Sequence, residues 1–383
     1  MSTKPIRGIA AAALALGLCL GGPSLAPAHA ELSSAVPALA PATRQLDTSK
    51  LPKVDLASKI ASFQAKHPAS HLDRPALRAI NPDDYVCDNN TDVAAWVDRE
   101  VAKLSQDDLQ VLQLTGLDML PAYDAMLATD TAAYPLTVDA QALTKTFRKL
   151  QRFWDINSSD IALMQMGGSI YSNVERMQMI YQELGLSPQD ALVIAQFVAD
   201  YVKTSEGLQQ GNNPLLTFNA FAYSTFGQYP QITDRIVMGP GLLQAYHELG
   251  YGDVAPQVVL AHEFGHHIQF ETGMISPDDA SSPEGTRRTE LHADASAAYF
   301  SSHPKGLSMQ FKRVAEFNRV FYGIGDCSFT SDGHHGTSAQ RMRAATWGYQ
   351  LQEANRPKSY IHPVLRFREL FDAALPTLVA PDA

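Results

Sequence analysis

The 383-residue sequence has little of several features, and each shortage excludes a class of protein. It contains 3 cysteines and 24 glycines, too few for a disulfide-stapled scaffold or a collagen-like repeat. Its 30 basic residues are outnumbered by 40 acidic ones, which argues against nucleic-acid binding because little positive charge is available to neutralise phosphates. Past residue 30, no apolar run approaches the 18 residues that suggest a membrane span. Hydrophobic residues nevertheless make up 45% of the chain, enough to build a core.

The first thirty residues have the pattern of a secretory signal peptide. Lys4 and Arg7 give a basic start, Gly8 to Leu20 is apolar, and Ala28-His29-Ala30 has the small residues of a cleavage site. The apolar stretch is shorter than the roughly 20 residues of a membrane helix, although an uncleaved anchor is the alternative. We therefore predict a signal peptide at residues 1–30 and export to the periplasm or the extracellular space.

Composition divides the rest of the chain into three regions. Residues 31–84 are rich in Ala, Pro and Ser, and their prolines exclude long helices, so this stretch is a linker, a pro-segment or an arm that wraps the surface. Residues 85–210 form a helix-rich N-terminal region, in which polar caps predict helices that begin after Thr91, Ser105 and Ser187. Residues 211–383 follow as a second domain.

Three short segments favour β-structure. They are Asp160–Met166, which alternates weakly, Leu216–Phe226, which is dense in aromatic residues, and Asp234–Met238, which is closed by Gly239-Pro240-Gly241. Mixed with the helices, these segments predict an α+β fold.

Export also changes what the cysteines can do. Cys19 leaves with the signal peptide, and Cys87 and Cys327 remain as an even pair in an oxidising compartment. We predict that these two form a disulfide between the helix-rich region and the C-terminal domain. Two buried, unpaired thiols are the alternative.

A helix predicted from Pro256 to about Glu271 carries the motif with the most chemistry, His262-Glu263-Phe264-Gly265-His266, a HExxH sequence. Residues four apart lie on one side of a helix, so both imidazoles can bind one metal ion. Zn²⁺ is the expected metal because it accepts imidazole nitrogen and leaves a position open for water in catalytic centres. Glu263 is placed to deprotonate a metal-bound water. Leu260, Phe264 and Ile268 predict that the helix is amphipathic, with one apolar stripe.

The third ligand must come from elsewhere in the chain. An extended HExxHxxGxxH pattern is excluded because Gln269 and Thr272 stand where its glycine and histidine would be. A second predicted helix holds Glu290 and Asp294 one turn apart. Glu290 could complete the site, and Asp294 could accept a hydrogen bond from the outer ring nitrogen of a ligand imidazole. A solvated acidic face is the alternative.

Two further histidines near these residues are not expected to be ligands. His292 projects away from Glu290 on the same helix, so the two cannot bind one ion together. His267 is expected to pack or to support a ligand rather than to bind metal.

A later segment contains His335, just before Gly336-Thr337-Ser338, where Thr337 or Ser338 is expected to cap a helix. A histidine there can donate a hydrogen bond to the oxyanion of a tetrahedral intermediate, which makes His335 a candidate catalytic residue. A loop histidine that stabilises the turn is the alternative. Gln340 and Arg341 are expected to make structural bonds rather than to contact substrate.

Three blocks of this sequence, taken in order, resemble the bacterial neutral zinc metallopeptidases, which are HExxH proteins of the glutamate-ligand (gluzincin) type. The blocks are His262–Gln269, Arg288–Asp294 and His335–Arg341, and the resemblance covers roughly residues 216–351. It implies a zincin-like catalytic core in residues 211–383. It also implies one Zn²⁺ per chain, with Glu290 as third ligand beside His262 and His266, and Glu263 as catalytic base. Gly239 departs from the family, in which an acidic residue is expected after the strand.

The expected function is therefore that of a secreted zinc metallopeptidase that hydrolyses peptide bonds through a zinc-bound water, with Glu263 as general base. An extended peptide or protein substrate is expected to pair with an exposed edge of the Ile236–Met238 strand. A zinc-containing binding protein or pseudoenzyme with a structural metal site is the alternative, and four protein ligands would favour it. A latent enzyme restrained by residues 31–84 is a further possibility.

Overall fold

The computed structural model describes residues 46–66, 91–275, 283–310, 313 and 336–380. The predicted signal peptide, Cys87, Cys327 and His335 lie outside these ranges, as does most of the 31–84 segment. From Asp47 onward the described residues belong to one compact unit.

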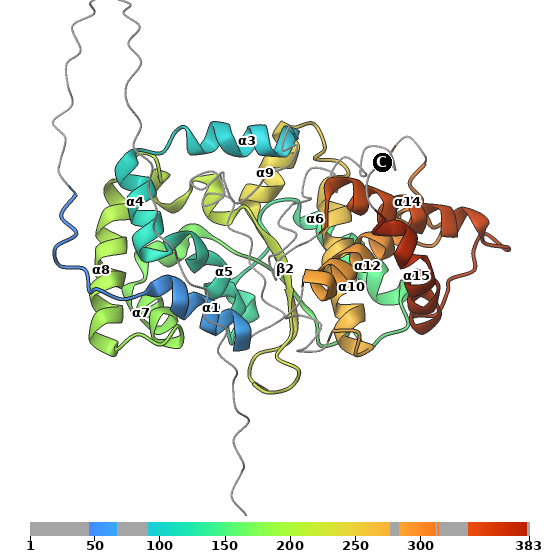
Figure 1. The fold of residues 1–383 in the computed structure, drawn as a ribbon, viewed down its shortest axis with the longest axis horizontal. Coiled ribbons are helices and arrows are strands. Elements are labelled where there is room, and N and C mark those ends of the chain that lie inside the picture. The colour runs from blue at the N-terminus through green and yellow to red at the C-terminus, as the bar shows by residue number, and fades with distance from the viewer. Residues whose placement is uncertain (1–45, 67–90, 276–282, 311–312, 314–335, 381–383) are drawn as a thin grey trace, which may run out of the picture. The chain divides into compact units, whose positions relative to one another are not determined.

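Helices make up most of the described chain, and a small sheet completes a mixed α+β fold, as predicted (Figure 1). Short 3₁₀ turns link several of the helices. The α-helices are α1 (Leu56–Lys66), α3 (Asp92–Val101), α4 (Gln106–Thr115), α5 (Leu120–Met126), α6 (Ala140–Phe153), α7 (Val174–Glu183), α8 (Pro188–Thr204), α9 (Pro240–Glu248), α10 (Ala255–Glu271), α12 (Pro283–Ser302), α14 (Ser338–Ala354) and α15 (Val364–Leu378). None of the described helices combines the length and the apolar character needed to cross a lipid bilayer.

The helix starts predicted in residues 85–210 are confirmed by their caps. The side chains of Thr91 and Ser187 each accept a hydrogen bond from the backbone N–H three residues on, at the starts of α3 and α8. Ser105 and Asp108 form a reciprocal capping box at the start of α4. Such bonds satisfy backbone N–H groups that have no partner within the helix.

The sheet has three strands in the order β1-β3-β2, namely β1 (Ala162–Gln165), β2 (Ala220–Tyr223) and β3 (Arg235–Met238). β1 pairs parallel to β3, and β2 pairs antiparallel to it. All three strands fall within the predicted β segments. The expected pairing of a substrate with an exposed edge of residues 236–238 is wrong, because β3 is the central strand and both of its edges are occupied.

Gly239, which follows β3, occupies a position too crowded for any side chain. A Cβ atom placed there would collide with the carbonyl oxygens of Thr217 and Asn219. An acidic residue therefore does not fit at this position. The chain continues at once into α9, because Pro240 occupies the first turn of that helix, where its missing N–H costs nothing.

α1 belongs to the 31–84 segment and packs against the rest of the chain. Its residues Leu56, Ile60 and Phe63 are buried. The Phe63 ring lies edge-on to Tyr123 of α5 at a centroid distance of 5.2 Å, and Lys59 donates a 2.6 Å hydrogen bond to the carbonyl of Gly185. Residues 56–66 are thus a docked helix rather than an extended linker.

α10, the HExxH helix, lies inside the molecule between α6, α12 and the sheet (Figure 1). Leu260, Phe264 and Ile268 are buried, but so are His267 and Gln269 on other sides of the helix. The prediction of an amphipathic helix with one apolar stripe is therefore wrong. A helix covered on nearly all sides must satisfy its polar side chains internally, and the bonds that do so form the site described next.

Candidate metal centre

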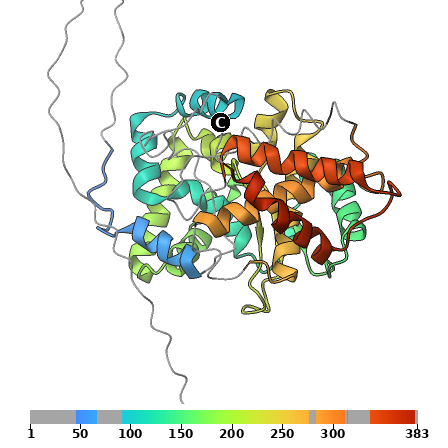
Figure 2. The same cartoon turned by 45° about the vertical axis from the view of Figure 1, so that its right-hand side comes forward.

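Close packing of α10 against α12 brings the metal-ligating residue types together. Gly265 of α10 faces Ala293 of α12, and a Cβ atom at Gly265 would lie 2.9 Å from the Ala293 Cα, too near for an ordinary contact. The missing side chain lets the two helices approach. α14 and α15 pack on α12 in turn (Figure 2), so that residues far apart in the sequence converge on α12.

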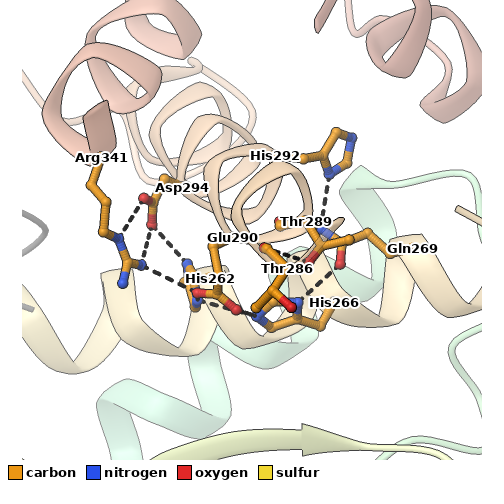
Figure 3. A network of polar contacts seen from close by, with 9 residues as sticks. All are labelled: His262, His266, Gln269, Thr286, Thr289, Glu290, His292, Asp294 and Arg341. Atoms are coloured by element: carbon orange, nitrogen blue, oxygen red, sulfur yellow. Dashed lines mark hydrogen bonds and ion pairs between the residues drawn. The ribbon is translucent and has the colours of Figure 1, made fainter. Parts of the chain in front are cut away.

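His262, His266 and Glu290 converge on one point (Figure 3). The two Nε2 atoms are 3.2 Å apart, and each lies 3.3 Å from an oxygen of the Glu290 carboxylate. Their side chains are 7%, 14% and 13% exposed, so the group is largely buried but still reaches solvent. The structure brings all three predicted ligands together, in a group that can hold a metal ion.

Asp294 lies directly behind the first imidazole. Its Oδ1 is 2.9 Å from Nδ1 of His262, so this carboxylate does contact an imidazole of the HExxH motif. Arg341 from α14 donates hydrogen bonds to both oxygens of the same carboxylate, at 2.8 and 2.7 Å. Its Nη2 also lies 3.6 Å from Oε2 of Glu290. Arg341 and Asp294 are 2% and 0% exposed, so this is a buried, bidentate ion pair.

The two carboxylates reverse the effect of burial on His262. Burial alone lowers the pKa of this imidazole, but its contacts with Asp294 and Glu290 outweigh burial and raise the pKa to about 10. Negative charge thus dominates at the centre, and it favours a positive charge between these groups.

The second imidazole has a neutral partner that the sequence interpretation missed. His266 Nδ1 lies 2.9 Å from Oε1 of Gln269. The same carboxamide donates to the Thr289 carbonyl at 2.6 Å and lies 3.2 Å from Nδ1 of His292. In the sequence, Gln269 is informative only because it stands where the extended HExxHxxGxxH motif has a glycine. Its position three residues after His266, on the same side of the helix, was the available signal.

The other two histidines stay away from the metal group, as predicted. His292 is buried with its ring against Phe367 and Phe371, at centroid distances of 5.5 and 5.1 Å. Burial lowers the pKa of His292 to about 3. His267 points toward the sheet, where its Nε2 donates to the Arg235 carbonyl at 3.0 Å.

The remaining predicted residues lie near the centre or outside the described chain. Glu263 follows His262 on α10 and is buried, with 6% of its surface exposed. Thr337 caps α14 in a capping box with Gln340, as predicted, and Gln340 also donates to the Val379 carbonyl. Both Gln340 and Arg341 therefore make the structural bonds expected of them.

Comparisons of this chain with protein-family models, with curated proteins and with solved structures found no match. The chemistry of the centre is therefore inferred from its own residues. Two imidazole nitrogens and one carboxylate lie close together in the centre. The other ring nitrogen of His262 contacts the carboxylate of Asp294, and that of His266 contacts the amide of Gln269.

Proposed function

We propose that the protein is a secreted zinc-dependent metallopeptidase with a zincin-like core, akin to the bacterial neutral zinc metallopeptidases of the gluzincin type. One observation carries the proposal. The two histidines of a HExxH helix meet the carboxylate of Glu290 from a second helix in a single three-residue group. These are the three residues that the sequence and the family resemblance predict as ligands.

The spacing of the donor atoms fits a tetrahedral zinc ion. With zinc–ligand bonds of about 2.0–2.1 Å, neighbouring corners of a tetrahedron lie about 3.3 Å apart. The two Nε2 atoms are 3.2 Å apart, and each lies 3.3 Å from a different oxygen of Glu290, Oε2 for His262 and Oε1 for His266. Nitrogen and carboxylate donors are also the set that zinc uses in hydrolytic sites.

The number of ligands favours catalysis over a structural role. Within the part of the chain that the structure describes, the group has three members, whereas structural zinc sites are closed by four protein ligands. A zinc ion bound there would supply Lewis-acid polarisation of a carbonyl group and would lower the pKa of water.

Glu263 is the residue that moves the proton. In the proposed reaction its carboxylate accepts a proton from the attacking water and passes it to the nitrogen of the leaving amine, which balances the hydrolysis of the peptide bond. Its place beside His262 in a buried helix supports this role. In this proposal the zinc ion is bound by His262, His266 and Glu290. His262 is held in place by Asp294, which is itself paired with Arg341.

Cleavage of a mixed peptide library by the purified, zinc-loaded protein tests the proposal. We expect cleavage that a chelator abolishes and added zinc restores. Glu263→Gln should retain about one zinc per chain but lose about 10²–10⁴-fold in rate, because it removes the base and no ligand. Equal rates in variant and wild type would refute the role of Glu263. A zinc-loaded wild type that cleaves nothing would favour the zinc-containing binding protein instead.

A further inference from the structure

The carboxamide of Gln269 is held in one orientation by its surroundings. The side chain is fully buried, and its Nε2 lies 2.6 Å from the Thr289 carbonyl oxygen. A carbonyl oxygen only accepts hydrogen bonds, so the amide nitrogen must face it. A flipped carboxamide would press two oxygens together at that distance. The amide oxygen of Gln269 is therefore directed at His266.

This orientation fixes which nitrogen of His266 carries hydrogen. An amide oxygen only accepts, and it lies 2.9 Å from His266 Nδ1, so Nδ1 must be the donor. The neutral ring then has its lone pair on Nε2, the atom that lies 3.3 Å from Glu290 and 3.2 Å from His262. That lone pair is what a metal ion binds.

The second hydrogen of the amide nitrogen is directed at His292. The distance from Gln269 Nε2 to His292 Nδ1 is 3.2 Å, and His292 is itself held between Phe367 and Phe371. Both hydrogens and the oxygen of the carboxamide are thus engaged inside the protein. α12 supplies both anchors, Thr289 and His292, and it also supplies the ligand Glu290.

We propose that Gln269 is a positioning residue of the metal centre, which sets the ring orientation and the tautomer of His266 through its bond to Nδ1. This inference rests on the proposed metal-binding role of His262, His266 and Glu290. It makes the two imidazoles unequal, because a carboxylate stands behind His262 and a neutral amide behind His266. It also couples the position of His266 to the backbone of α12.

The test compares three variants of the full chain for zinc affinity and stability. Gln269→Met keeps the size of the side chain but removes the acceptor and both donors, so the zinc dissociation constant should rise about 10–100-fold. Gln269→Glu keeps an oxygen facing His266, so zinc affinity should be rescued relative to Gln269→Met even where thermal stability falls. Gln257→Met makes the same exchange on the same helix, where Gln257 donates to the Asp253 carbonyl at the surface, and should leave zinc affinity unchanged.

A second readout needs no metal. Long-range ¹H–¹⁵N spectra of protein labelled at histidine report which ring nitrogens carry hydrogen, and His266 is assigned by its loss in His266→Ala. We expect hydrogen on Nδ1 of His266 in the metal-free wild type and in Gln269→Glu, and a mixture of tautomers in Gln269→Met.

Two results would overturn the inference. One is a neutral His266 protonated at Nε2 in the wild type. The other is a folded Gln269→Met variant with wild-type zinc affinity. A wild type that shows the expected tautomer but binds no zinc would instead count against the proposed function, which keeps the two failures distinct.

Discussion

The helix pair α10–α12 buries His262 on a side that carries carboxylates, the charged side, and His292 on a side lined by phenylalanines, the apolar side. The pKa values of these two histidines shift in opposite directions. His262 faces Asp294 and Glu290, and its pKa rises to about 10. His292 packs against Phe367 and Phe371, and its pKa falls to about 3. Both rings are almost completely buried. Burial, together with the nearby charges of Arg288 and Arg368, therefore disfavours a positive charge on His292, whereas the neighbouring carboxylates favour one on His262.

This contrast explains why some histidines of the two helices, and not His292, lie in the group that could hold a metal ion. The cost of burying Asp294 is offset by its bidentate pairing with Arg341, which leaves Oδ1 also in contact with His262. No such carboxylate faces His292 among the contacts of the described chain. A substitution on one side can therefore be compared with a matched substitution on the other.

The largest effect is expected from Glu290→Ala. It removes one of the three proposed ligands and a charge that would partly neutralise the zinc ion, so the variant should be largely metal-free and inactive. His292→Phe, two residues along on the apolar side, removes one of the two anchors of Gln269 but no proposed ligand, so it should still take up about one zinc per chain. Metal analysis of both purified variants checks this. If Glu290→Ala retains zinc and His292→Phe loses it, the third ligand is His292 and not Glu290.

Arg341→Met should be the most destabilising of the remaining changes. It leaves the Asp294 carboxylate buried without its cation, and breaking a buried ion pair from one side costs about 3–5 kcal/mol. Arg341→Lys keeps a charge but loses the fork that matches a carboxylate, so its loss should be smaller. Urea unfolding of the metal-free proteins measures both, and a variant as stable as wild type would show that the ion pair contributes nothing.

Asp294→Asn should weaken the site without destroying it. The amide keeps the shape of the carboxylate and avoids the cavity that Asp294→Ala would leave beside Arg341, but it removes the charge behind His262. Zinc affinity or activity should fall about 10–100-fold, and excess zinc should refill the site. Zinc titration of Asp294→Asn beside Glu290→Ala decides between the two carboxylates. If only Asp294→Asn loses its zinc for good, their roles are exchanged.

The smallest effect concerns acid sensitivity on the apolar side. Because the pKa of folded His292 is about 3 and that of an unfolded histidine is about 6.5, only the unfolded chain takes up this proton between those values. The free energy of unfolding should therefore fall as the pH drops below 6.5, by about 2 kcal/mol at pH 5 from this residue. Urea unfolding at pH 7 and pH 5 should show a smaller acid loss in His292→Phe than in wild type.

Local patterns in the sequence were enough to predict the helices and to place both histidines of the HExxH motif on one side of a helix. The caps at Thr91, Ser105 and Ser187 depend on side chains within three residues, and the sharing of a side by His262 and His266 follows from helical periodicity. Glu290 and Asp294 follow from the same rule. The resemblance to the gluzincin-type peptidases, and not periodicity, predicted Glu290 as the third ligand.

Contacts between distant segments could not be predicted from local sequence patterns. Arg341 is 47 residues from Asp294, and the Gln269 amide depends on the backbone of Thr289 in another helix. The central place of β3 depends on pairing with β1, which comes from the helix-rich region. The burial of α10 on nearly all sides likewise depends on neighbours that its own periodicity does not contain.

The position of the metal is the most direct test of the account. Crystals of zinc-loaded protein, measured on both sides of the zinc absorption edge, should give one anomalous peak bonded to Nε2 of His262, Nε2 of His266 and the Glu290 carboxylate, with its fourth position free of protein. A peak at His292 or His267, or a zinc ion closed by a fourth protein ligand, would contradict a catalytic centre at this site.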